Sequence, residues 1–202
     1  TMLVVNTEHG FLMGEHDWWA KVVTPFFQEV AHIPFWIYDP RQPNCVAETR
    51  DSVVQTIDLP PTILDYFEIP ATRDMQGEPL ARTILNDEPV REAALYGVMG
   101  GQVNVTDGQY VYMRGNVTED NAPLFEYTLM PTHMNSLFSV RELSDWEKFE
   151  DFSFTKGCPI MQIPSRTPRF LLARDNPYGK GRTATLLFDV QADPGQTNPL
   201  VD

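Results

Sequence analysis

The sequence predicts an α/β fold in two parts, a portion of an α/β core over residues 1–92 and a small antiparallel α+β subdomain over residues 93–202. Two observations support this prediction. Residues 1 to about 90 alternate between strand-like runs, loops and a helical segment, which is typical of a parallel α/β sheet. After Ala93 the strand-like runs are short and are separated by turn signals, as in an antiparallel sheet.

The first part is expected to contain two strands and a helix. Residues 2–5 form a β-like run, and the continuous apolar run 33–38 suits a strand that is buried on both faces. Asp58 can cap a helix whose first turn contains a Pro-Pro pair. A polar linker is predicted over residues 83–91.

The second part begins with short β-like stretches at residues 94–96, 102–106 and 109–114. Asp107-Gly108, between the last two stretches, is a strong hairpin signal. Residues 170–172 and 185–190 are predicted as further strands.

One helix is predicted within the second part. Ser139 and Glu142 have the spacing of a capping box, in which each side chain bonds to the other residue's backbone. Apolar side chains follow at helical spacing, namely Leu143, Trp146 and Phe149. We therefore expect an antiparallel sheet with one helix.

Composition excludes some classes of function. The 202 residues carry a net charge of −13, which disfavours a nucleic-acid-binding surface because phosphate neutralisation needs clustered Lys and Arg. No run approaches the roughly 20 apolar residues of a membrane span. Cys45 and Cys158 are too few for a disulfide framework, and one bridge between them is an open alternative. The sequence leaves the compartment open.

A loop with two potential metal ligands follows the first β-like run. Glu8 and His9 come directly after residues 2–5, where a parallel strand would bring side chains to its carboxyl end. Taken alone, such a pair is more often solvated or hydrogen-bonded than metal-bound. The loop continues through Gly14-Glu15-His16 to Lys21.

This block resembles the second active-site motif of the sulfatases, a branch of the alkaline-phosphatase superfamily. Glu8 falls on the family's metal-binding Asp, His9 on its Asn or His, and Lys21 on the Lys that contacts sulfate. Glu8 departs from the family pattern, because its side chain is one methylene longer than that of Asp and metal–oxygen distances vary little.

Four further segments look like sulfatase motifs in the family's order. They are residues 29–37, 57–65, 76–80 and 187–200. The resemblance extends from the first residues to the last, although residues 116–182 match no family motif. It implies the C-terminal portion of an alkaline-phosphatase-like core, followed by the family's small antiparallel subdomain.

The family's nucleophile is not matched. Sulfatases of this type oxidise the Cys or Ser of a C/S-x-P-x-R motif to formylglycine, and neither Cys45 nor Cys158 fits that motif. In the segment Ser165 to Arg169 the Pro stands one position late. We interpret the chain as the C-terminal part of a longer sulfatase, inactive alone, whose partner is the missing N-terminal half.

The resemblance implies a divalent metal shared with that missing half. Glu8 and His9 would be the ligands from this chain. Calcium suits a carboxylate-rich site, and an imidazole ligand leaves manganese as an alternative. Lys21 would be catalytic through a contact with the sulfate, whereas its default reading is a surface lysine.

Three residues are expected to contact substrate. His16 either binds substrate or orders the loop, and the second role is favoured because Glu15 and Asp17 offer local charge partners. Trp18 either lines a substrate mouth together with Trp19 or packs under the loop. His133 lies in the unmatched region, where family loops can reach the cleft, although a surface-loop His is the commoner interpretation.

The function implied is hydrolysis of a sulfate-ester substrate. Phosphodiester or phosphonate monoester hydrolysis is an alternative, since such enzymes share the motif of Glu8 and His9. A non-catalytic binding module is a second alternative, which the replacement of Asp by Glu8 supports. Self-association is a further expectation, because a sheet that lacks its partner strands exposes an edge.

Overall fold

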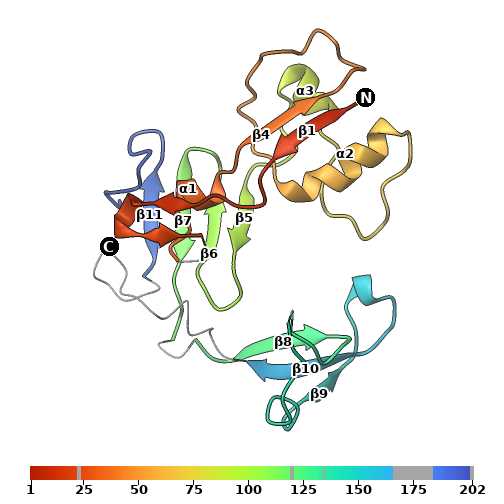
Figure 1. Ribbon diagram of the computed structural model, residues 1–202, viewed down its shortest axis with the longest axis vertical. Helices are drawn as coiled ribbons and strands as arrows, with labels where there is room; N and C mark the ends of the chain where they lie inside the picture. The colour runs from red at the N-terminus through yellow and green to blue at the C-terminus, as the bar shows by residue number, and fades with distance from the viewer. Residues whose placement is uncertain (22–23, 119–120, 134, 166–183, 201–202) are drawn as a thin grey trace.

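The computed structural model describes residues 1–21, 24–118, 121–133, 135–165 and 184–200. Within these residues the strands form four small sheets, and every pairing in them is antiparallel (Figure 1). Two sheets have two strands, one has three and one has four.

The first sheet joins β1 (Leu3–Asn6) to β4 (Phe35–Tyr38), with Val5 opposite Trp36. Their pairing is antiparallel, so the parallel sheet expected for this part is wrong within the described residues. An apolar run indicates a strand but not its direction, which depends on the path of the connection. Burial of β4 on both faces is also wrong, because Trp36 is 64% exposed.

Two helices lie beside this sheet (Figure 1). The predicted helix is present as α2 (Leu59–Tyr66), preceded by the 3-10 helix η2 (Thr56–Asp58). Asp58 occupies the N-cap position but its side chain does not cap α2, which corrects that expectation. The expected linker over residues 83–91 is partly helical, since α3 spans Ala81–Asn86.

The four-stranded sheet has the order β11-β7-β6-β5. Its strands are β5 (Ala94–Gly97), β6 (Val103–Thr106), β7 (Tyr110–Arg114) and β11 (Leu186–Asp189). The predicted hairpin is confirmed, because Asp107 Oδ1 accepts hydrogen bonds from the backbone N–H groups of Gln109 and Tyr110 between β6 and β7.

The main core lies on this sheet. Phe27 packs there with buried apolar side chains from β7 and β11, namely Val111, Met113, Leu186 and Phe188. Phe27 comes from the N-terminal segment that contains α1 (Gln28–Ala31). The two parts of the chain therefore share a core, and the division at residue 92 stays a prediction.

The three-stranded sheet has the order β8-β10-β9. Its strands are β8 (Leu124–Thr128), β9 (Glu147–Phe149) and β10 (Ile160–Ser165), with the 3-10 helix η3 (Ser153–Thr155) before β10. Phe149, Phe152 and Tyr127 pack their rings together, with centroids 5.1 to 5.2 Å apart.

The helix predicted behind Ser139 is wrong. Ser139 and Glu142 do make the capping contacts, with Ser139 N donating to Glu142 Oε2 over 2.7 Å and Glu142 N to Ser139 Oγ over 3.3 Å. The residues that follow form turns and then β9. Pairing of β9 with β10 uses the backbone that a helix would need.

Three smaller expectations can be settled or placed. Cys45 and Cys158 are free thiols, so the disulfide bridge between them is not formed. The strand predicted at residues 170–172 lies outside the described residues. In the part of the chain that the structure describes, no helix is both long and apolar enough to cross a membrane.

Candidate functional site

Glu8 and His9 lie in the loop after β1, and their side chains meet. Glu8 Oε1 is 3.1 Å from His9 Nε2, and His9 Nδ1 is 2.9 Å from the carbonyl oxygen of Gly10. When Nδ1 carries the ring proton and donates it to that carbonyl, the Nε2 lone pair faces the carboxylate oxygen. Two electron-rich atoms at this distance call for a proton or a cation between them.

The donor set therefore fits one side of a cation site. The Glu8 side chain is 84% exposed and the His9 side chain 35% exposed, while the His9 Nε2 atom itself is buried against Glu8. No group of three or more His, Cys, Asp or Glu side chains suited to a metal occurs among the described residues. Two donors are too few for calcium, which takes about 6 to 8 oxygen ligands.

Gly10 presses the loop against α1. Its N–H donates to the carbonyl oxygen of Val30 over 2.9 Å. A Cβ at this position would lie 1.8 Å from the carbonyl oxygen of Glu29, far inside contact distance. Only glycine allows this approach, so the position of α1 determines the position of the loop.

A tight turn follows between β2 (Leu12–Met13) and β3 (Trp19–Ala20), through the 3-10 segment η1 (Glu15–Asp17). Gly14 N donates to the Trp18 carbonyl over 2.8 Å, which closes the turn. His16 has a φ of 54°, in the left-handed region that a non-glycine residue seldom adopts. Backbone N–H donors, chiefly those of Glu15 and Met13, lower the pKa of the Glu15 carboxyl.

His16 points inward from this turn. Its imidazole stacks on the ring of Phe27 with centroids 3.6 Å apart and an interplanar angle of 11°. Its Nε2 lies 3.7 Å from Glu29 Oε2, and the His16 side chain is only 5% exposed. Glu29 therefore faces His16 across this contact.

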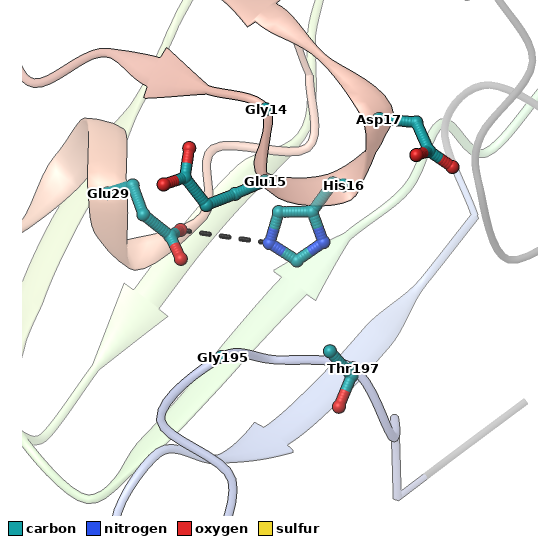
Figure 2. Close-up of a pocket in the computed structure, with 7 residues that line it drawn as sticks. All are labelled: Gly14, Glu15, His16, Asp17, Glu29, Gly195 and Thr197. Atoms are coloured by element: carbon teal, nitrogen blue, oxygen red, sulfur yellow. Dashed lines mark ion pairs between the residues drawn. The ribbon is translucent and has the colours of Figure 1, made fainter.

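A hollow of about 380 Å³ opens beside His16 (Figure 2). Its lining residues are Gly14, Glu15, His16, Asp17, Glu29, Gly195 and Thr197. Figure 2 shows that the last two come from the C-terminal loop, across the hollow from the imidazole. The lining contains three carboxylates and no Lys or Arg, so an anionic group would need another source of positive charge here.

A second hollow of about 610 Å³ adjoins the first and shares Gly14 and Asp17 with it. Trp18, Trp19 and Ala20 complete its lining. Trp18 is half-buried, whereas Trp19 is 71% exposed. The two indoles thus form an apolar wall next to a carboxylate.

The remaining candidates lie elsewhere. Lys21 is exposed directly after β3 and lines neither hollow. His133 lies between β8 and β9, where its Nε2 is 2.6 Å from Glu142 Oε1 and its ring packs on Phe138. Figure 1 shows the β8-β10-β9 sheet apart from α1. The side-chain contacts of His133 are with Glu142 and Phe138, and it lines neither hollow.

Sequence reasoning did not identify Glu29, Gly195 and Thr197 as lining residues. Gly195 and Thr197 belong to the segment 193–200 that matches a closing family motif, which offered a signal. Nothing local in the sequence indicates that this segment contacts a turn formed by residues 14–17.

Comparison with known proteins identifies relatives of one kind, although no protein-family model matches the chain. The chain is 26% identical over 212 residues to an ulvan-active sulfatase of Formosa agariphila, covering 97% of the chain and 40% of that protein. It is 30% identical over 79 residues to an arylsulfatase of Clostridium perfringens, and this match covers 38% of the chain and 16% of that protein. An N-acetylglucosamine-6-O-sulfatase of Bacteroides thetaiotaomicron is 22% identical over 162 residues, covering 73% and 28%.

The chain therefore spans less than half the length of these curated relatives. A solved structure of a protein in complex with its substrate D-glucosamine-2-N,6-O-disulfate superposes with a TM-score of 0.51 at 17% identity. The superposition covers 98% of this chain and 29% of that one. At this identity the likeness concerns the fold, and it confirms the predicted α/β class.

Proposed function

Because this chain is a homologue of the sulfatases and matches their C-terminal part, we propose that it forms one side of the active site of a sulfate-ester hydrolase. The observation that carries the proposal is the contact of Glu8 Oε1 with His9 Nε2 at 3.1 Å, in a loop that Gly10 holds against α1. Carboxylate and imidazole are both metal-ligand types. The His9 Nε2 atom is buried and has no hydrogen-bond partner among the described residues, which suits an atom that awaits a ligand.

Glu8 and His9 would hold a divalent metal, calcium first and manganese as the alternative. The remaining ligands would come from a preceding half of the same polypeptide, the partner of this chain. When bound, such a metal stabilises negative charge on the oxygens of the ester group. In the tautomer whose Nδ1 proton bonds to the Gly10 carbonyl, His9 leaves the Nε2 lone pair for the cation.

Lys21 is proposed to contact the sulfate. An ammonium group stabilises negative charge that develops as the ester bond breaks. The formylglycine nucleophile that the family resemblance implies would also lie outside this chain. The chain alone would then supply ligands and a cation but no attacking group, and it would be inactive.

His16, Trp18 and His133 are proposed to contact substrate. The two hollows support this role for His16 and Trp18, because they adjoin each other next to the turn at Gly14. Their lining suits a sugar ring, which can stack on an indole and whose hydroxyl groups can donate hydrogen bonds to carboxylates. One relative is named as an N-acetylglucosamine-6-O-sulfatase, which supports a sulfated saccharide as the substrate class. His133 would have to approach as part of a longer protein.

The test uses the longer polypeptide that contains this chain. We expect the purified protein to release sulfate from 4-nitrophenyl sulfate, and to do so faster than it releases phosphate from 4-nitrophenyl phosphate or a phosphonate monoester. A preference for the phosphorus substrates would assign the protein to the alternative class of hydrolases. Binding of a sulfated saccharide without turnover of any ester would indicate a non-catalytic module.

A further inference from the structure

The C-terminal loop is bonded to α1, although the two are distant in sequence. Gln196 Oε1 accepts a hydrogen bond of 2.6 Å from the backbone N–H of Gln28, which is the first residue of α1. Gln196 is completely buried. The first N–H groups of a helix have no partner within it, and Gln196 supplies one from outside.

The loop that carries Gln196 is itself closely held. Gln196 N donates to the carbonyl oxygen of Asp193 over 3.0 Å. The carboxylate of Asp193 accepts from Thr197 Oγ1 over 3.1 Å and from Asn198 N over 2.7 Å. Gln196 has a left-handed φ of 48°, which the surrounding bonds maintain.

Three contacts of α1 and its flanking residue lead toward the candidate site. Phe27, the N-cap residue, stacks on His16, and Glu29 faces the same imidazole at 3.7 Å. Val30 accepts from Gly10 N over 2.9 Å, one residue beyond His9. The backbones of Gly10 and α1 are in such close contact that even a Cβ on Gly10 would overlap the carbonyl oxygen of Glu29.

We propose that α1 positions both the loop of Glu8 and His9 and the turn of His16. Gln196 is the positioning residue that holds α1 in place. The inference rests on the proposed function for its effect on turnover. A displaced α1 would move Val30 O and Glu29 together, so the ligand pair and the imidazole would shift in concert. Gln196 touches neither the metal nor the substrate and acts through α1.

Two substitutions at Gln196 separate the acceptor from side-chain volume. Gln196→Leu removes the acceptor at similar size, whereas Gln196→Glu keeps an oxygen that can accept from Gln28 N. Gln191→Leu is the matched control, because Gln191 is exposed and its side chain donates a hydrogen bond of 3.3 Å to Gly108 O, away from α1. All three variants are made in the longer polypeptide.

The first measurement is sulfate release from 4-nitrophenyl sulfate as a function of added calcium. We expect Gln196→Leu to raise the calcium concentration for half-maximal rate by about 10-fold or more, as for other residues that orient a metal ligand. Gln196→Glu should lie closer to the wild-type value than Gln196→Leu does, although burial of its carboxyl has a cost, and Gln191→Leu should equal wild type. A lower Tm for Gln196→Leu with an unchanged calcium requirement would overturn the proposal, since Gln196 would then be structural only.

The second measurement is amide hydrogen exchange at Gly10, which does not depend on turnover. We expect Gln196→Leu to accelerate exchange there more than Gln196→Glu does, and Gln191→Leu to leave it unchanged. Unchanged exchange at Gly10 in Gln196→Leu would overturn the proposal that Gln196 positions this loop through α1. If the wild-type protein hydrolyses no sulfate ester, the proposed function fails. The exchange result alone then decides whether α1 positions the loop.

Discussion

Asp58 and Arg91 form a buried, bidentate ion pair. Arg91 Nη2 donates to Asp58 Oδ1 over 2.5 Å and Arg91 Nη1 donates to Oδ2. The Asp58 carboxylate is completely buried and also accepts from the backbone N–H groups of Gln55 and Glu78, over 2.7 and 2.9 Å. Burial raises the pKa of Asp58, but the hydrogen bonds, above all from Arg91, outweigh it and hold the pKa below its usual value.

Removing the cation should leave a buried charge without its partner. We expect Arg91→Met to lower the free energy of unfolding by about 3 to 5 kcal/mol, which urea denaturation measures. Arg82→Met is the control, because Arg82 pairs with Glu88 on the surface and such pairs contribute about 0 to 1 kcal/mol. Equal losses in the two variants would contradict our assignment of the buried pair.

The same pair makes stability depend on pH. Because the pKa of Asp58 is lower in the folded protein than in the unfolded chain, its contribution is present above the unfolded value of about 3.9. It is lost as the pH falls from there through the folded pKa. We expect the Tm of wild type, measured by thermal unfolding, to fall more steeply below about pH 4 than the Tm of Asp58→Asn.

The outer face of the β1–β4 sheet presents four exposed apolar side chains, namely Leu3, Val5, Trp36 and Tyr38. An open two-stranded sheet with an apolar face is prone to associate. We expect the 202-residue chain to self-associate in sedimentation velocity, and Val5→Lys to reduce this. Val117→Lys, at a more exposed apolar residue outside the sheet, is the control. A monodisperse monomer at high concentration would contradict the prediction.

Local signals predicted the strands of the four-stranded sheet well. The turn at Asp107-Gly108 depends on hydrogen bonds between residues two and three positions apart, so the local sequence was enough to predict it. The capping contacts of Ser139 and Glu142 were local as well and do form. The helix behind them was not decided locally, since Phe149 packs on Tyr127 from another strand.

The candidate site was predictable only in part. The adjacency of Glu8 and His9 could be read from the sequence, and their side chains do meet. The contact of Glu29 with His16 could not be predicted, because His16 reaches Glu29 only through the left-handed turn. The role of Gln196 could not be predicted either, because its partner Gln28 lies 168 residues away in the sequence.

Lys21 gives a test of the catalytic proposal that does not involve the metal ligands. In the longer polypeptide, we expect Lys21→Ala to reduce kcat for 4-nitrophenyl sulfate by about 10²-fold or more, as when one charge-stabilising donor is lost. Lys21→Arg should lose less, because it keeps the positive charge but not the compact ammonium geometry. Equal activity of Lys21→Ala and wild type would remove Lys21 from the proposed site.

The isolated chain should bind calcium weakly, because Glu8 and His9 offer only one carboxylate and one imidazole. Isothermal titration calorimetry on the 202-residue chain should show no tight stoichiometric binding, and 4-nitrophenyl sulfate should not be hydrolysed. Tight binding would mean that the chain contains further ligands.

The central claim is that Glu8 is a metal ligand, and metal content of the purified longer polypeptide tests it most directly. Glu8→Gln keeps the side-chain length but removes the negative charge, so we expect it to lower both the bound metal per protein and the rate of sulfate release. Glu8→Asp, which restores the family's residue, should retain both or increase them. If both variants leave metal content and rate unchanged, Glu8 is not a ligand and the match of this loop to the sulfatase motif is wrong.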